Sequence, residues 1–159
     1  MTTDHDQSQA PAFADFDDKP HEECGVFGIY APGEEVARTT FFGLYALQHR
    51  GQESAGIAAT DGEHISVRRN LGLVSQAFDE SDIGALPGFA AIGHTRYSTA
   101  GSTLECNAGP MYVETDLGPI AISHNGNLTN AVQLREEMEA QDEHFITTTD
   151  SEVLARLIA

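Results

Sequence analysis

Cys24 is the first residue whose position in the chain suggests chemistry. It stands directly before a short apolar run, residues 25–30, and 23 residues of a different character precede it. If those residues were removed, Cys24 would carry a thiol and a free α-amine together. An α-amine with a pKa of about 7.7–8.0 is partly neutral near physiological pH and can accept the thiol proton. Cys24 therefore fits an N-terminal nucleophile, and the alternative is an ordinary buried cysteine at the start of a strand.

Three further stretches hold polar residues that a scaffold of strands and turns would not require; they are residues 48–56, 94–101 and 124–127. Arg96 could hold a carboxylate through two parallel hydrogen bonds. The side-chain amide of Asn125 and the backbone N–H of Gly126 could form an oxyanion hole. Asp150 could bind an α-ammonium group. With a cysteine nucleophile, these groups would suit an amino acid that has a reactive side-chain amide, and glutamine fits that description.

Structural alternatives exist for each of these residues. Arg96 could be a solvated arginine at a strand end, Asn125-Gly126 could be a plain turn, and Asp150 could cap a helix. A zinc site is also conceivable from the four residues Cys24, His94, Cys106 and His124. The two cysteines are far apart and no CxxC or HxxxH pair occurs, which argues against zinc. The surroundings of Cys106 favour a structural role in a loop.

The elements that would position these residues are predicted to be mostly strands and hairpins first, followed by helices on the outside. Strands are predicted at 25–30, 54–60, 63–69, 89–94, 111–115 and 119–124, and helices at 36–49, 128–140 and 149–159. The first strand is expected to be buried, because it is apolar and rich in Val, Ile and aromatic residues. Asp61-Gly62 is a hairpin signal, 116–118 joins a second hairpin, and 78–87 is expected to be a loop with a helical turn. Thr149 and Glu152 match a capping box. This order favours an α+β layered domain.

Composition limits the class of protein. The formal net charge is −17, which argues against nucleic acid or an anionic membrane as a partner. No apolar stretch approaches the length of a membrane span, the N-terminus lacks a signal-peptide pattern, and two cysteines do not make a disulfide framework. We therefore expect a cytoplasmic protein. Residues 1–23 are acidic and predicted to be disordered, either as a plain tail or as a removable propeptide.

Four motifs together carry a family resemblance; they are residues 24–28, 48–56, 93–99 and 124–127. They closely resemble the glutaminase domain of the amidophosphoribosyltransferase family, and the resemblance runs from residue 24 to residue 159. It implies the fold of an N-terminal-nucleophile hydrolase, a four-layer αββα sandwich, which we expect to be incomplete at the C-terminus. The chain stops inside its last predicted helix, so we expect a piece of something longer.

The resemblance also implies roles for single residues. Cys24 would attack the glutamine amide, form a thioester and release ammonia. Asn125 and Gly126 match the oxyanion hole of the family, Arg96 the residue that holds the glutamine α-carboxylate, and Asp150 the residue that meets the α-amine. One further match, Arg50, corresponds to an arginine beside the glutamine loop, and Tyr97 and Thr99 lie near the start of the loop that covers glutamine.

The family uses the ammonia to make 5-phosphoribosylamine from phosphoribosyl pyrophosphate, the first step of de novo purine synthesis. The transferase domain, its magnesium, and a 4Fe–4S cluster would belong to a C-terminal part that this sequence lacks, and the whole enzyme would be a homo-oligomer. Members with an acidic leader remove it by self-processing. The alternatives are the glutaminase domain of another class II amidotransferase, or an inactive fragment that keeps its leader. Glucosamine-6-phosphate synthase fits less well, because it has Tyr-Arg-Gly-Tyr-Asp where this chain has residues 49–53.

Overall fold

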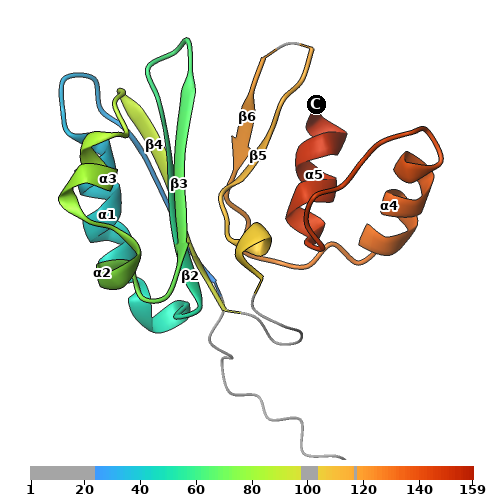
Figure 1. The fold of residues 1–159 in the computed structure, drawn as a ribbon, viewed down its shortest axis with the longest axis horizontal. Coiled ribbons are helices and arrows are strands. Elements are labelled where there is room, and N and C mark those ends of the chain that lie inside the picture. The colour runs from blue at the N-terminus through green and yellow to red at the C-terminus, as the bar shows by residue number, and fades with distance from the viewer. Residues whose placement is uncertain (1–23, 98–103, 117) are drawn as a thin grey trace, which may run out of the picture.

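Four layers of secondary structure make up the protein in a computed structural model that describes residues 24–97, 104–116 and 118–159 (Figure 1). Three helices form the first layer: α1 (Val36–Ala46), α2 (Val74–Ala77) and α3 (Glu80–Gly84). The second layer is an antiparallel sheet in the order β1 (Gly25–Tyr30), β4 (Ala90–Arg96), β2 (Ser54–Thr60), β3 (Ile65–Leu71). The third is the hairpin of β5 (Met111–Val113) and β6 (Ile120–Ile122), and the fourth holds α4 (Ala131–Glu139) and α5 (Asp150–Ile158). The predicted αββα arrangement is confirmed.

The main core lies between α1 and the four-stranded sheet. Leu44 and Ile57 are fully buried there, and alternate strand residues such as Phe27 pack against the same cluster. Helix α1 approaches β4 closely because residue 93 is glycine: a Cβ at Gly93 would lie 2.7 Å from Cγ2 of Thr40. Since successive strand residues point to opposite faces, the residues between these core positions face the β5–β6 layer.

The register of the β1–β4 pair places the first motif beside the third. Gly25 pairs with Thr95 in antiparallel register, so Cys24, one residue before β1, lies in line with Arg96, the last residue of β4. By the alternation of the pleat, Cys24 and Arg96 lie on the face that is turned away from α1. Two residues that are 72 positions apart in sequence therefore meet at one corner of the sheet.

One prediction is wrong: β1 is not a buried strand. It forms the edge of the sheet, and Val26 and Tyr30 are 41% and 72% exposed. An apolar run cannot reveal by itself which of its two faces is covered, and only the face with Phe27 and Ile29 packs on α1. This strand starts the site even so, because its first residue follows Cys24 directly.

Other element boundaries shift by a few residues. The helix predicted at 36–49 ends at Ala46 and continues as the 3₁₀ turn Gln48–Arg50, and the helix predicted from residue 128 begins at Ala131. The capping box of α5 is half formed. Thr149 accepts a hydrogen bond from the backbone N–H of Glu152, but the Glu152 carboxylate turns instead to the backbone N–H groups of Ile146 and Thr147.

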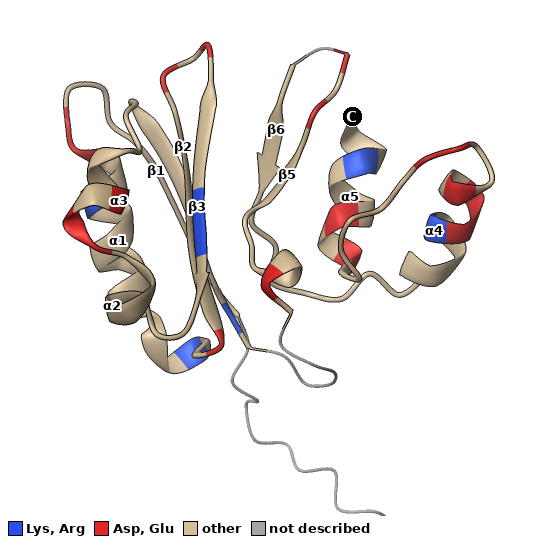
Figure 2. Cartoon of the chain, in the orientation of Figure 1, with Lys and Arg blue, Asp and Glu red and all other residues tan. Residues whose placement is uncertain are grey.

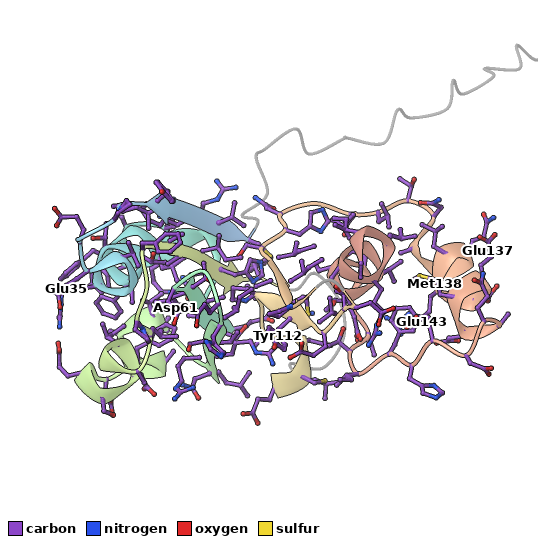
Figure 3. All side chains as sticks on the ribbon, turned by 90° about the horizontal axis from the view of Figure 1, so that it is seen from above. Glu35, Asp61, Tyr112, Glu137, Met138 and Glu143 are labelled. Carbon is purple, nitrogen blue, oxygen red and sulfur yellow. The ribbon has the colours of Figure 1, made fainter. Side chains whose placement is uncertain are left out.

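Acidic residues lie mainly on the helices and on the loops (Figure 2). Seen from above, Glu35 and Glu137 project from opposite ends of the molecule (Figure 3). Among the described residues, no helix is long and apolar enough to cross a membrane. The leader, residues 1–23, and Thr99 lie outside the described residues.

Candidate active site

An open cleft of about 620 Å³ lies between the end of β4 and the start of α5. Its walls come from five parts of the chain: the residue before β1, the end of β4, residues 104–111 up to the start of β5, residues 122–131 from the end of β6 to the start of α4, and residues 148–151 around the start of α5. Four of the six predicted site residues line it, and these are Cys24, Arg96, Gly126 and Asp150. The fold thus gathers most of the predicted residues into one cavity.

The Cys24 thiol is held at the end of β4. The backbone N–H of Tyr97 donates to Sγ at 3.4 Å, and Sγ donates to the Tyr97 carbonyl oxygen at 3.6 Å. The next backbone N–H, that of Gly25, donates to Oγ1 of the buried Thr95 at 3.2 Å. These contacts fix the thiol in the wall of the cleft, as a nucleophile requires.

Arg50 contacts the backbone of the nucleophile rather than the cleft. It ends the 3₁₀ turn Gln48–Arg50, and its Nε donates to the carbonyl oxygen of Cys24 at 3.4 Å. Arg50 does not line the cleft. The structure therefore gives it a place behind Cys24, where it holds the main chain of that residue.

Arg96 reaches the cleft from β4. Its Nη1 donates to the carbonyl oxygen of Asn107 at 2.6 Å, which fixes one edge of the guanidinium. A guanidinium carries five N–H donors in a planar fork, so an arginine held in this way keeps the geometry that suits a carboxylate. Arg96 is not simply a solvated arginine at a strand end.

Asp150 lies across the cleft, as the first residue of α5. Its Oδ2 accepts a hydrogen bond from the backbone N–H of Leu128 at 2.7 Å, and its Oδ1 lies 3.9 Å from Nδ1 of His124. The N-cap of α5 is Thr149, so Asp150 does not serve as the cap. A half-buried carboxylate in the wall of a cleft is suited to bind a cation such as an ammonium group.

The two residues predicted to form an oxyanion hole, Asn125 and Gly126, differ in their position relative to the cleft. Both residues belong to the turn that follows β6, and Gly126 lines the cleft whereas Asn125 is exposed and does not. A Cβ at Gly126 would lie 2.9 Å from Nε2 of His124, so the backbone at Gly126 approaches that ring closely. Of the two residues in the predicted pair, Gly126 is therefore the one at the wall of the cleft.

Two further residues line the cleft, Asn107 and His94. The sequence did not single out Asn107, and it suggested His94 only as a possible zinc ligand. Asn107 is 4% exposed, and its amide makes two hydrogen bonds to Thr148: Nδ2 donates to Oγ1 at 2.9 Å and Oδ1 accepts from the backbone N–H at 3.0 Å. His94 is 7% exposed, and neither ring nitrogen has a hydrogen-bond partner among the described residues. Burial lowers the pKa of His94 to about 4, so its ring is neutral at pH 7.

No metal site forms in the described residues. No three side chains of His, Cys, Asp or Glu come together there in a way that could hold an ion, so Cys24, Cys106, His94 and His124 are not gathered into one site. Cys106 lies in the 3₁₀ turn Glu105–Asn107, where its Sγ is 3.8 Å from Oδ1 of Asn107.

Comparison with known proteins gives consistent matches. Residues 78–159 match a family model described as a glutamine amidotransferase domain. The amidophosphoribosyltransferase of Synechococcus elongatus is 58% identical over 138 residues, which cover 87% of this chain and 28% of that protein. The corresponding protein of Bacillus subtilis is 47% identical over 139 residues, covering 87% and 29%.

Two solved structures show the same fold. One, described as the allosteric regulatory enzyme of purine biosynthesis, matches with a TM-score of 0.78 and 46% identity over 84% of this chain and 29% of that chain. The other, a glutamine phosphoribosylpyrophosphate amidotransferase from Bacillus subtilis complexed with ADP and GMP, matches with a TM-score of 0.75 and 44% identity, covering 84% and 28%. The chain thus spans a little under a third of the length of these relatives.

Proposed function

The chain belongs to the glutamine amidotransferase domain family, and we propose that it hydrolyses the side-chain amide of glutamine with Cys24 as the nucleophile. One observation carries the proposal. The Cys24 thiol, the Arg96 guanidinium and the Asp150 carboxylate line one cleft, although they come from three separate segments of the chain. The resemblance inferred from the four motifs is confirmed by the family match and by the relatives.

The two charged residues would hold the amino-acid end of glutamine. Arg96 would bind the α-carboxylate through its guanidinium fork, and Asp150 would bind the α-ammonium group through its carboxylate. With the α-carboxylate and the α-ammonium group both held, the side-chain amide of glutamine extends toward Cys24. This binding mode uses the substrate end that does not react to place the amide carbon beside the thiol.

The reaction would proceed through a thioester. The Cys24 sulfur attacks the amide carbon, its proton passes to the base and then to the leaving nitrogen, and ammonia departs as the thioester forms. Water then attacks the thioester carbon, releases the thiol and leaves glutamate. The backbone N–H of Gly126 is the donor at the cleft that could stabilise the oxyanion, and Asn125 would have to turn toward the cleft to join it.

The base in this proposal is the α-amine that Cys24 would gain by loss of residues 1–23. In the uncleaved chain the nitrogen of Cys24 is part of an amide and cannot accept a proton, so an uncleaved chain would be inactive. Activity should therefore depend on removal of residues 1–23. This dependence tests whether the leader is a removable propeptide, and it distinguishes an active enzyme from an inactive precursor.

The use of the ammonia extends the proposal. The names of the relatives support transfer to phosphoribosyl pyrophosphate, in the first step of purine synthesis, by a protein of which this chain is one part. A homo-oligomeric enzyme, magnesium and a 4Fe–4S cluster in the remaining part, and a cytoplasmic location are proposed on the family resemblance alone.

The test combines intact mass with an ammonia assay on the full chain. We expect the mass to fall by that of residues 1–23 and the mature protein to release ammonia from glutamine. Cys24→Ala should abolish release, and Cys106→Ser, which alters the other cysteine, should retain it. Release of ammonia by Cys24→Ala would refute the proposed role of Cys24. An unchanged mass without any release would identify the chain as an inactive precursor.

A further inference from the structure

Asn107 lies between the two groups that would hold the substrate. It is the last residue of the 3₁₀ turn Glu105–Asn107, it lines the cleft, and only 4% of its surface is exposed. A buried side-chain amide is retained in a fold only when its polar atoms are paired, because an unpaired one is costly. The partners of Asn107 therefore indicate what it does.

Those partners lie on opposite sides of the cleft. On one side, the carbonyl oxygen of Asn107 accepts the bond from Nη1 of Arg96 at 2.6 Å. On the other side, the Asn107 amide holds Thr148 twice, through its hydroxyl and through its backbone N–H. Thr148 is two residues before Asp150. One residue is thus bonded to the arginine of β4 and to the segment that leads into Asp150.

The segment that carries Asn107 is itself fixed to the four-stranded sheet. Nη1 of Arg69 in β3 donates to the carbonyl oxygens of Ala108 and Pro110, at 3.2 and 3.3 Å. The backbone of Gly109 also lies directly against β2, since a Cβ at Gly56 would meet the Gly109 carbonyl oxygen at 2.0 Å. Asn107 therefore extends from a fixed base and is not free to follow a movement of Thr148.

We propose that Asn107 is a positioning residue that sets the separation of Arg96 and Asp150, and so makes the cleft selective for a free α-amino acid. This inference rests on the proposed function. The carboxylate and the ammonium group of an α-amino acid are attached to the same carbon, so their two protein partners must keep one fixed spacing. A displacement of about 1 Å in such a site can lower kcat/KM by up to about a hundredfold.

The test measures KM and kcat for glutamine in the full mature chain. Asn107→Ala removes both bonds to Thr148, and we expect KM to rise at least about tenfold while kcat changes by less than about threefold. Thr148→Val removes only the hydroxyl partner and should raise KM by a smaller factor. The double variant should be no worse than Asn107→Ala, because both substitutions break the same contact.

A second readout separates positioning from a general structural effect. Iodoacetamide is a small neutral amide without α-substituents, so its rate of alkylation of Cys24 should be the same in Asn107→Ala as in the unmodified protein. The matched control is Asn70→Ala. Asn70 also makes a half-buried bond from its amide, to the carbonyl oxygen of Ala77 at 2.6 Å, but it lies away from the cleft, and its loss should leave KM unchanged.

Each outcome decides the proposal. An unchanged KM in Asn107→Ala, or slower alkylation of Cys24 together with a fall in kcat, would overturn it while leaving the proposed function intact. If Asn107→Ala does not fold, an unchanged KM in Thr148→Val would overturn it instead. If the unmodified mature protein releases no ammonia from glutamine, the proposed function fails, and the inference that rests on it fails too.

Discussion

The backbone N–H of Leu128 donates a hydrogen bond of 2.7 Å to Oδ2 of Asp150, and this bond joins the turn after β6 to the first residue of α5. The carboxylate therefore has two tasks. One oxygen holds the turn that carries Gly126, and the other remains on the cleft side, near His124. A change at Asp150 can consequently affect both substrate binding and the oxyanion donor, and a useful variant must separate these two effects.

Asp150→Asn makes this separation. The new side chain keeps an oxygen that can accept the Leu128 N–H, but it loses the negative charge that would pair with an α-ammonium group. Hydrogen bonds to charged groups contribute about 1.5–3 kcal/mol, so we expect KM for glutamine to rise by roughly tenfold to a hundredfold. Steady-state kinetics with glutamine and with glutaric acid monoamide, which lacks the α-amine, provide the measurement. The monoamide should be affected far less than glutamine.

The control for Asp150→Asn is Asp142→Asn. Asp142 is exposed and has a φ of 68°, a conformation that asparagine adopts readily, so its kinetics should be unchanged. An equal loss for glutamine and for the monoamide in Asp150→Asn would show that Asp150 supports the turn and does not recognise the α-amine.

Local patterns predicted most of the fold that positions the site. The strand Ser54–Thr60 was predicted with its observed bounds, and Asp61-Gly62 marked the hairpin to β3, because these features depend on residues next to one another. That Arg96 and Asp150 line the cleft could be anticipated, because charged residues at element ends are conspicuous in a sequence. The Asn107–Thr148 contact was not predictable, since it joins two loops 41 residues apart and neither loop has a pattern of its own.

Local sequence patterns could not predict the exposure of β1 or the position of the Asn125 side chain, for a similar reason. Whether the second face of an apolar strand is covered depends on a separate layer of the fold, and here Val26 stays 41% exposed. Whether the side chain of an Asn-Gly turn points into a cleft depends on the packing of that turn, and the Asn125 side chain does not line it.

Buried His94 should make stability depend on pH. Its folded pKa, lowered by burial to about 4, lies below the ordinary value of 6.5. Between these values the unfolded chain binds a proton that the folded chain does not, so the free energy of unfolding falls as the pH falls from 6.5 toward 4. The loss attributable to this residue is about 3 kcal/mol when complete. Urea denaturation at pH 7, 6, 5 and 4.5 provides the measurement.

His94→Gln should flatten this dependence, because glutamine does not titrate. The control is His64→Gln at an exposed hairpin position, where the side chain is 79% accessible and the original slope should persist. A slope in His94→Gln equal to that of the unmodified protein would mean that other groups cause the acid destabilisation.

Glu152 is expected to be the most important carboxylate for the loop before α5. It is 3% exposed and accepts bonds from the backbone N–H groups of Ile146 and Thr147 and from Arg156. Burial alone would raise its pKa, but these donors outweigh burial and lower it. Glu152→Ala leaves two buried backbone donors without their partner and leaves Arg156 with Glu143 as its remaining carboxylate, which should cost about 3 kcal/mol in the free energy of unfolding.

The matched substitution is Glu80→Ala, which removes an ion pair with Arg38 on the outer surface. Exposed pairs contribute little, so the denaturation midpoint should scarcely move. Equal midpoint shifts for Glu152→Ala and Glu80→Ala would contradict the structural role of Glu152.

The contribution of Glu152 to stability should also depend on pH. Because the Glu152 pKa is lowered, its contribution to the free energy of unfolding should be present at pH 7 and disappear as the pH falls below about 4.5.

The contact between Gly56 and Gly109 offers a steric test of how the cleft is supported. A Cβ at Gly56 would lie 2.0 Å from the Gly109 carbonyl oxygen, a backbone atom that cannot move aside without shifting the segment that carries Asn107. Gly56→Ala should therefore cost about 1–3 kcal/mol in the free energy of unfolding, and it should also raise KM for glutamine.

The control is Gly84→Ala at the end of α3, where a Cβ would meet nothing within 4 Å. There the same added methyl should stabilise the protein by about 0.5–1 kcal/mol and leave KM unchanged. A normal KM in a destabilised but folded Gly56→Ala would show that the Asn107 segment can shift without disturbing the cleft, so the combined measurement tests the support of the site and not only the strength of the fold.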